Sequence, residues 1–341
     1  MKNSLTVLQA FPVPRPTTNP YLVMLGDSLR KIDEVSVLNF TWRQAIFGKY
    51  DVYHSHWPEI LVGGSGQFKT LIKQLLVVIF LIRLKLTRTP IVRTLHNINR
   101  PDGMSWRQTY LLDAIDRHTS LFIRLNPTTP VMPKMPSVTI PHGHYKQWFS
   151  SYPSRETITG RFSFVGLIRR YKGVEQLLES FAKIDKSNTD ISLQIAGNPS
   201  TEEIAKVVRE LGLRDERVST ELRFLTDAKM VKIVTCSELV VLPYHFMHNS
   251  GSLLMALSLA RPVLVPDNAV NRGIEKEVGP GWVHFFSGEL DSEDLLAALA
   301  ESRGQERGRE PDLDRRNWDT AGVQHVQAYR AAISRVRRGR E

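Results

Sequence analysis

Residues 162–173 read FSFVGLIRRYKG, and this stretch decides how the rest of the sequence is interpreted. Its apolar start and its first glycine predict a short buried strand that ends in a turn. Arg169, Arg170 and Lys172 follow, and a helical segment begins near Val174. Cations directly before a helix predict a phosphate site, because charge, guanidinium groups and free backbone N–H groups converge there.

The same succession of strand, turn and helix recurs along the chain. Most of the short apolar runs lack strict alternation, which is typical of parallel strands covered on both faces. Helical segments lie between many of them, so we predict an α/β fold with doubly wound layers. The expected strands are Thr6–Gln9, Val35–Phe40, Val52–His54, Ile91–Leu95, Leu121–Leu125, Val138–Ile140, Arg161–Val165, Ser192–Ala196, Glu221–Phe224, Leu239–Leu242, Pro262–Val265 and Val283–Phe286. The expected helices include Gly66–Leu86, Trp106–His118, Val174–Lys183, Thr201–Leu211 and Ser252–Ala260.

At 341 residues, the chain is long enough for two domains. The stretch Gln147–Gly160 is rich in polar residues and divides the two series of strands, so it is interpreted as a linker. We therefore predict similar α/β domains at 1–150 and 151–315. A final segment, 316–341, is expected to form a helix with a basic tail.

The positive charge lies in the first half of the sequence. Residues 1–150 hold 18 Lys and Arg against 8 Asp and Glu, whereas residues 151–341 hold 27 of each. This asymmetry suggests an anionic partner, which could be nucleic acid, a membrane surface or a phosphorylated substrate; simple solubility is the alternative. A single cysteine, Cys236, excludes a disulfide framework and fits a reduced cytoplasmic setting.

Several function classes lack their sequence signatures. The first strand is followed by neither the Gly-x-Gly-x-x-Gly of a dinucleotide site nor a phosphate loop with its lysine, which disfavours hydride transfer and ordinary nucleotide hydrolysis. No apolar run is long enough to span a membrane. The longest, Leu75–Ile82, has eight residues and is flanked by Lys and Arg. It is either a membrane-surface helix or a core helix with extended basic side chains.

Histidines gather at the predicted ends of first-domain strands. His54 and His56 are two residues apart, so both point the same way, and His96 follows another strand. They are either hydrogen-bonded strand-end residues or substrate contacts, and zinc would need all three as ligands. His142 and Gly143 close the domain at a further strand end, where glycine permits close approach to a ligand.

A second helix start in the later half resembles the first. The segment His248-Asn249-Ser250-Gly251-Ser252 leads into the helix that follows the strand Leu239–Leu242. Its free N–H groups would face an anion, and two helix starts at neighbouring strand ends suit a diphosphate. The alternative is that Ser250 or Ser252 only caps the helix and that Arg170 is solvated.

Taken together, these motifs resemble the group-1 branch of glycosyltransferases with the GT-B architecture. The resemblance covers nearly the whole chain and rests on Asp-Val-x-His-x-His-x-Pro at 51–58, Ile-Pro-His-Gly at 140–143, residues 166–173, Ile-Ala-Gly-Asn at 195–198 and Ala-Arg-Pro-Val at 260–263. It implies two Rossmann-like domains that face each other across a cleft. The first binds the acceptor, the second binds a nucleotide-sugar, and the C-terminal helix returns toward the first domain. Within the branch, the sequence looks most like bacterial exopolysaccharide mannosyltransferases that extend a polyprenyl-diphosphate glycolipid.

The resemblance implies a metal-independent hexosyltransferase on the inner face of the cell membrane, with no cofactor besides its GDP- or UDP-sugar substrate. Mannose from GDP-mannose is the leading expectation, a lipid-linked glycan is the acceptor, and the basic first domain meets the membrane. The diphosphate-binding residues would be Arg169, Lys172, Ser250 and Gly251. If the reaction inverts, the candidate general bases are Glu59 and His56; if it retains, the leaving phosphate can take the proton. Donor or acceptor contacts would come from His54, His96, His142, Gly143, Asn249 and Ser252.

One departure and two rival functions accompany this interpretation. Where the branch usually has two glutamates, this sequence has Met247 and Met255, so either Asn249, Ser250 and Ser252 take over or the donor binds in a different pose. A non-enzymatic nucleic-acid- or membrane-binding protein would use the basic first half and its tryptophans. A sugar-nucleotide epimerase would need no acceptor.

Overall fold

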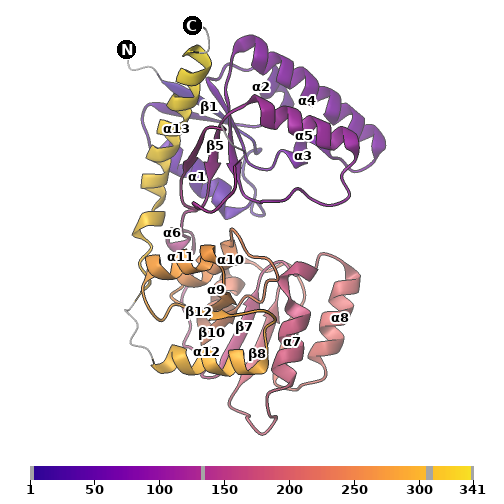
Figure 1. The fold of residues 1–341 in the computed structure, drawn as a ribbon, viewed down its shortest axis with the longest axis vertical. Helices are drawn as coiled ribbons and strands as arrows, with labels where there is room; N and C mark the ends of the chain where they lie inside the picture. Colours follow the sequence, from indigo (N-terminus) through magenta and orange to yellow (C-terminus); the bar gives the residue numbers. More distant parts are fainter. Residues whose placement is uncertain (1–3, 132–134, 305–309, 339–341) are drawn as a thin grey trace. The chain divides into compact units, whose positions relative to one another are not determined.

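The computed structural model describes residues 4–131, 135–304 and 310–338. They form two compact units. Unit 1 takes in the chain up to Gly143 together with the segment from Arg315 onward, and unit 2 takes in His144–Asp314. Each unit contains one six-stranded sheet in which every strand pair is parallel (Figure 1). The predicted α/β fold with two doubly wound layers is therefore confirmed.

In unit 1 the strand order is β2-β1-β3-β4-β5-β6. Helices α1 and α13 pack together on one face of the sheet, and α2, α3, α4 and α5 contact one another on the other (Figure 1). The strands are β1 (Leu5–Gln9), β2 (Val35–Asn39), β3 (Val52–Ser55), β4 (Ile91–Leu95), β5 (Thr119–Arg124) and β6 (Ser137–Thr139). The helices are α1 (Pro20–Arg30), α2 (Trp42–Phe47), α3 (Glu59–Val62), α4 (Gln67–Thr87), α5 (Trp106–His118) and α13 (Trp318–Arg338).

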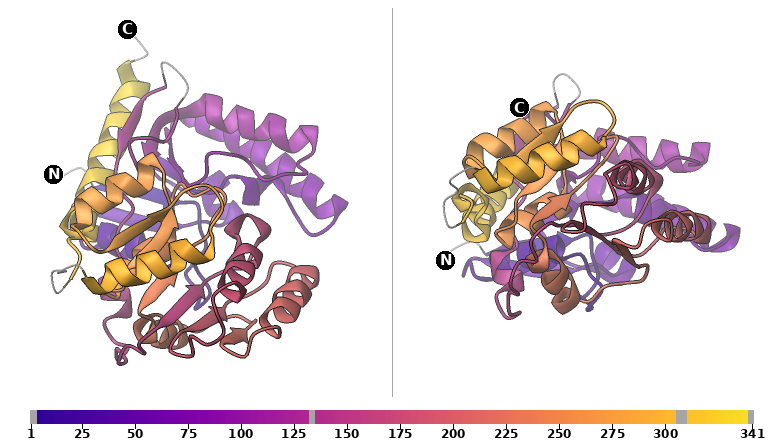
Figure 2. Two further views of the ribbon diagram at one scale, coloured as in Figure 1. Left: turned by 60° about the horizontal axis from the view of Figure 1, so that its bottom comes forward. Right: turned by 90° about the horizontal axis from the view of Figure 1, so that it is seen from below.

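In unit 2 the strand order is β12-β11-β10-β7-β8-β9. Figure 2 shows from two directions that helices lie on both sides of this sheet. The strands are β7 (Arg161–Val165), β8 (Ser192–Ala196), β9 (Val218–Glu221), β10 (Leu239–Val241), β11 (Val263–Pro266) and β12 (Val283–Phe286). The helices are α6 (Lys146–Phe149), α7 (Val174–Ala182), α8 (Glu202–Gly212), α9 (Asp227–Cys236), α10 (Gly251–Ser258), α11 (Ala269–Val278) and α12 (Ser292–Gly304).

One predicted strand, Glu221–Phe224, is wrong. The strand that pairs with β8 is β9, which ends at Glu221, and its register runs from Val218 opposite Leu193 to Glu221 opposite Ala196. Phe224 lies beyond the strand and is 63% exposed. The apolar residue that attracted the prediction therefore belongs to a loop, because pairing with β8 decides where this edge strand lies.

The segment 147–160, expected to be a linker, is fixed to unit 2. It begins within α6, the backbone N–H of Arg155 donates to Thr235 Oγ1 at 3.0 Å, and that of Ile158 donates to the carbonyl of Cys236 at 2.9 Å. Polar composition alone does not reveal these backbone partners. The basic tail proposed for the C-terminus is described only as far as Arg338, where α13 ends; residues 339 and 340 lie outside the described residues.

Two glycines allow close backbone approaches around the basic turn, Gly197 to the end of β7 and Gly173 to the segment after β10. Gly197 has a φ of +152°, and a β-carbon there would clash with the carbonyl oxygen of Gly166. Gly173, between the basic turn and α7, has a φ of +65° and lies equally close to the carbonyl of Pro243. Only glycine permits these approaches. The basic turn, which is a 3-10 turn over Arg170–Lys172, is thereby fixed against the strand ends.

A pair of glycine variants tests this packing. Gly197→Ala forces a clash between backbone atoms, so we expect the free energy of unfolding to fall by about 2 kcal/mol or more. Gly273→Ala is the matched control: Gly273 lies exposed in α11, and a β-carbon there would meet nothing within 4 Å. The control should gain up to about 1 kcal/mol through helix propensity. Thermal denaturation followed by circular dichroism measures both, and equal melting temperatures would contradict the close approach.

Candidate functional site

The Lys172 side chain in unit 2 is mostly buried, and no described carboxylate pairs with its ammonium group. The residue is 9% exposed, and its Nζ lies 4.9 Å from the ring centroid of Tyr244. Within the described part of the chain, Nζ has no hydrogen-bond or ion-pair partner. An unpaired charge is costly to bury, whereas a bound anion would compensate it. The predicted phosphate-binding role of Lys172 therefore has a physical basis in its surroundings.

The start of α10 lies beside this lysine. A β-carbon built on Gly166 would be 3.2 Å from Ser252 Oγ and 3.6 Å from Lys172 Nζ, so both side chains converge on the turn after β7. Ser250 Oγ accepts a hydrogen bond from the backbone N–H of Leu253 at 3.2 Å. Ser250 therefore caps the helix, as the alternative interpretation held. Ser252 lies in the first turn, where the helix dipole favours an anion.

The two arginines of the basic turn differ. Arg170 pairs with Glu203 at 2.5 Å, and both side chains are about 70% exposed (69% and 71%), so the prediction that Arg170 is solvated is confirmed. Arg169 is exposed with an extended backbone, and no described residue accepts a hydrogen bond from its guanidinium. Arg169 is thus the arginine of this turn that is available for an added anion.

Apolar side chains occupy the positions where the resemblance expects glutamates. Met247 and Met255 are both buried, at 5% and 7% exposure. Asn271 Nδ2 lies 3.5 Å from the Met247 sulfur and donates to the carbonyl of Pro266 at 2.8 Å. Asn249, expected to take over a polar role, is half-buried in the loop before α10. Unit 2 therefore has a donor-side chemistry without carboxylates at these two positions.

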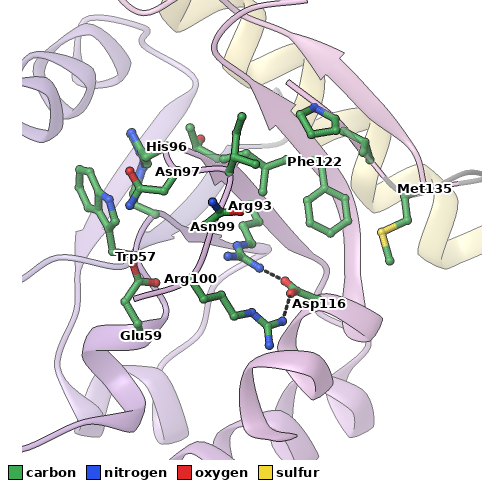
Figure 3. Close-up of a pocket in the computed structure, with 16 residues that line it drawn as sticks. Trp57, Glu59, Arg93, His96, Asn97, Asn99, Arg100, Asp116, Phe122 and Met135 are labelled. Carbon is green, nitrogen blue, oxygen red and sulfur yellow. Dashed lines mark hydrogen bonds and ion pairs between the residues drawn. The ribbon is translucent and has the colours of Figure 1, made fainter. Parts of the chain in front are cut away.

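Unit 1 has its own cavity, of about 240 Å³, at the carboxyl ends of β3 and β4 (Figure 3). This edge of a parallel sheet is where ligands bind in such folds. The rings of Trp57 and His96 stack there, with centroids 4.0 Å apart and an interplanar angle of 22°. Aromatic and amide groups of this kind suit a sugar ring and its hydroxyls. The lining residues are His56, Trp57, Glu59, Arg93, Thr94, Leu95, His96, Asn97, Ile98, Asn99, Arg100, Asp116, Phe122, Pro130, Val131 and Met135.

The cavity contains two carboxylates in different states. Asp116 forms ion pairs with Arg93 and, at 2.8 Å, with Arg100, as the dashed lines in Figure 3 show. Glu59 has no hydrogen bond or ion pair to any residue that the structure describes. The Glu59 charge favours the charged form of the nearby Arg93, but no described donor occupies the Glu59 oxygens, so Glu59 can accept a proton from a bound hydroxyl. Of the two predicted general bases, Glu59 has the suitable surroundings.

The histidines beneath the cavity are buried and neutral. Burial lowers the pKa of His56 to about 3, and burial with the neighbouring histidines lowers the pKa values of His54 and His96 well below their usual range. A neutral imidazole with so low a pKa is a weak base. His54 is fully buried between Thr94 and Tyr329, which matches the interpretation as a hydrogen-bonded strand-end residue. Among the described residues, no group of three His, Cys, Asp or Glu side chains is arranged to hold a metal ion.

His142 and Gly143 lie against the C-terminal segment. The carbonyl of His142 accepts a hydrogen bond from Arg316 Nη1 at 3.1 Å, and its ring centroid is 4.7 Å from that of Tyr21. A β-carbon on Gly143 would clash with the indole of Trp318. Packing within unit 1 therefore explains the glycine that was predicted to admit a ligand.

The sequence analysis missed most of the residues that complete these sites. Tyr329 and Gln9, which hold the histidines, are far from them in sequence and carry no local signal. Arg93 and Arg100 flank the predicted strand end at His96 and could have been found by examining residues on both sides of that end. Trp57 lies inside the quoted motif at 51–58 but was not assigned a role.

Acid should destabilise the protein through its buried histidines. Burial lowers the pKa of His325 to about 4 in the folded protein, against 6.5 for the free side chain. Between these values the unfolded chain binds more protons, so the free energy of unfolding falls as the pH drops from about 6.5 to about 4. His325→Phe should flatten this slope by up to about 1.4 kcal/mol per pH unit. Urea denaturation at several pH values measures it, with His118→Gln at the exposed end of α5 as the control; an unchanged slope in His325→Phe would contradict the assignment.

Comparisons with known proteins agree with this geometry. The family model "Glycosyl transferases group 1" matches residues 159–302, most of unit 2. The GDP-mannose:glycolipid 4-beta-D-mannosyltransferase of Xanthomonas campestris pv. campestris is 43% identical over 331 residues, which cover 97% of this chain and 93% of that protein. The alpha-D-kanosaminyltransferase of Streptomyces kanamyceticus is 32% identical over 114 residues, or 33% of this chain and 29% of that protein.

Solved structures share the fold at low sequence identity. Sucrose-phosphate synthase from Thermosynechococcus elongatus has a TM-score of 0.64 at 14% identity, covering 97% of this chain and 99% of that one. Anabaena HepE, solved in complex with UDP, has a TM-score of 0.58 at 14% identity, covering 98% of each chain. These likenesses show the GT-B fold, and the matches do not favour a non-enzymatic protein. The chain belongs to the group-1 family of glycosyltransferases.

Proposed function

We propose that this glycosyltransferase moves a mannosyl group from GDP-mannose to a lipid-linked glycan. The observation that carries the donor half is the placement of the Lys172 ammonium: no described carboxylate pairs with it, and it converges with Ser252 of α10 on the turn after β7. The relative from Xanthomonas, which matches along nearly the whole length of both chains, supports the choice of GDP-mannose and of a glycolipid acceptor.

The donor site acts on the departing diphosphate. When the bond between the sugar carbon and the phosphate oxygen breaks, negative charge grows on that oxygen, and cations fixed beside it lower the barrier. Lys172 supplies a charge that needs no reorganisation, because its side chain is already buried and held over Tyr244. Arg169 and the backbone N–H groups at the start of α10 add donors. We infer that these groups carry the positive charge and that the nucleotide-sugar is a substrate that needs no further cofactor.

The cavity of unit 1 supplies the general base for the reaction. In our proposal the acceptor hydroxyl binds in the unit 1 cavity and Glu59 takes its proton as the oxygen attacks the sugar carbon. Asp116 is less suited to this task, because two arginines already hold it. A side-chain base of this kind belongs to an inverting displacement. His56 and His96, neutral and hydrogen-bonded to each other at 3.2 Å, position groups at the wall of the cavity.

Helix α4 offers a surface for the membrane that holds the acceptor. Val77, Phe80 and Leu84 are buried against unit 1, but the opposite side of the helix is exposed and apolar. The interpretation of this segment as a core helix therefore holds for one side of the helix only. The exposed apolar residues are Phe68, Leu71, Ile72, Leu75, Val78, Ile79, Ile82 and Leu86. A contiguous patch of this kind marks an interaction site.

Basic residues surround this patch. Lys69, Lys85 and Arg88 are exposed, whereas Lys73 and Arg83 donate to backbone carbonyls within unit 1. An apolar helix face with exposed cations suits the interface of an anionic membrane. No described helix is long and apolar enough to cross the bilayer. We therefore propose that the enzyme binds peripherally to the cytoplasmic face of the membrane through α4.

Nucleotide binding tests the donor site. We expect GDP, more than UDP or ADP, to raise the melting temperature, because a ligand at about 100 times its Kd adds about 2.7 kcal/mol. Lys172→Ala should abolish this shift and lower kcat by about 10²–10³-fold, the usual loss for one oxyanion donor. Arg170→Ala is the matched control, since Arg170 is exposed in the same turn and paired with Glu203. A GDP shift of equal size in wild type and Lys172→Ala would disprove the assignment.

Vesicle binding tests the membrane surface. The double variant Leu75→Glu and Ile82→Glu places two charges on the exposed side of α4, where they should not disturb the core. We expect co-sedimentation with phosphatidylglycerol vesicles to fall at least tenfold, and wild-type binding to weaken with added salt. Leu213→Glu in unit 2 is the control, because Leu213 is 81% exposed but far from α4 in sequence and in another unit. Equal binding by all three proteins would rule out α4 as the contact.

A further inference from the structure

A chain of hydrogen bonds runs through the interior of unit 1 from the C-terminal helix to the cavity. Tyr329 on α13 is fully buried, and its hydroxyl lies 2.7 Å from His54 Nδ1. Gln9 Nε2 donates to the same hydroxyl at 3.2 Å, and Gln9 Oε1 lies 3.1 Å from His56 Nε2. His56 Nδ1 in turn lies 3.2 Å from His96 Nε2, at the cavity wall.

The direction of this chain follows from its one amide. Gln9 Oε1 can only accept, so His56 Nε2 carries a proton and donates it. Because burial keeps His56 neutral, its Nδ1 has no proton and accepts from His96 Nε2–H. The Tyr329 hydroxyl, which accepts from Gln9, is left to donate to His54 Nδ1, and His54 Nε2–H then donates to Thr94 Oγ1 at 2.8 Å. All three rings therefore carry their proton on Nε2.

The chain ends on a group that shapes the cavity. His96 is held on one side by His56 and on another by Tyr21, whose ring meets it edge-on with centroids 4.9 Å apart. Its flat side stacks on Trp57, which lines the same cavity as Glu59. Fixing the ring of His96 therefore fixes the indole beside the proposed base. A His96 ring whose proton moved to Nδ1 would lose its bond to His56, and the stack with Trp57 would lose that support.

We propose that Tyr329 is a positioning residue for sugar transfer: through Gln9 and His56, its hydroxyl fixes the tautomer and orientation of His96 and thereby the Trp57 side of the acceptor cavity. The role in transfer rests on the function proposed above. The hydrogen-bonded chain itself rests only on the geometry of unit 1.

Histidine tautomers in Tyr329→Phe test the chain directly. Long-range ¹H–¹⁵N correlation spectra of histidine-labelled protein show which ring nitrogen carries the proton, and single-histidine variants assign the signals. In wild type we expect His56 and His96 as single Nε2–H tautomers. Tyr329→Phe removes the acceptor of the Gln9 amide, so the amide can rotate and both histidines should become tautomer mixtures. Wild-type tautomers in Tyr329→Phe would overturn the proposal.

Tyr50→Phe is the matched control. Tyr50 is a buried tyrosine of the same unit whose hydroxyl donates to the carbonyl of Ala45 at 2.6 Å, so the variant loses a similar hydrogen bond outside the chain. It should be destabilised like Tyr329→Phe but keep the wild-type tautomers. A tautomer mixture in Tyr50→Phe would overturn the proposal, because general loosening of unit 1 would then explain the effect.

Kinetics separate the chain from the proposed function. With GDP-mannose and a bacterial lipid-linked oligosaccharide extract, Tyr329→Phe should lower kcat about tenfold and leave the KM for GDP-mannose unchanged. Glu59→Gln should abolish transfer while keeping the wild-type tautomers. If wild type transfers no mannose, the proposed function fails; if Glu59→Gln remains fully active, the assignment of Glu59 as the base fails. In either case the NMR spectra still test the hydrogen-bonded chain from Tyr329 to His96. Altered tautomers with unchanged transfer kinetics would overturn the positioning role.

Discussion

The Lys172 ammonium lies 4.9 Å from the ring centroid of Tyr244 on a mostly buried side chain, and no described carboxylate pairs with it; the turn that holds it depends on close backbone approaches. The turn before it fits only because Gly166 and Gly197 bring two strand ends together, and the turn after it fits only because Gly173 approaches the carbonyl of Pro243. The positive end of α10 lies beside it. In the proposed function a bound diphosphate would compensate these positive charges and dipoles, so the same residues would serve both the packing of the turn and donor binding.

Unit 1 differs from unit 2 because the groups buried in its interior are neutral histidines. Its buried histidines have lowered pKa values and carry no charge at neutral pH, so they can be hydrogen-bonded in a dry interior without a compensating ion. Ion pairs at its cavity gather around Asp116, which leaves Glu59 as the described lining carboxylate without a hydrogen bond or ion pair. In the proposed function, unit 2 would supply positive charge to the leaving group and unit 1 would supply one carboxylate base.

Helix α4 shows that an apolar run does not disclose what it packs against. Its eight-residue run Leu75–Ile82 fits a buried helix as well as a membrane-surface helix. When a helix is apolar on most sides, its periodicity does not identify which face is buried. In the folded protein one side packs against α2, α3 and α5, and the other side meets solvent. Part of the excess positive charge of residues 1–150 lies beside this patch, since exposed lysines are on the helix that carries it.

The sequence by itself determined the parallel α/β fold, the positions of most strands and the cation-rich turn at Arg169–Lys172, because apolar periodicity, glycine turns and charge before a helix are local properties of the chain. It also placed histidines and Glu59 at one strand end. Only the tertiary structure decided that Lys172 is buried, that Asp116 is paired while Glu59 is not, and that Tyr329 reaches His54 across 275 positions of sequence. The burial of a side chain and its hydrogen-bond or ion-pair partners depend on segments distant in sequence, so no local sequence pattern predicts them.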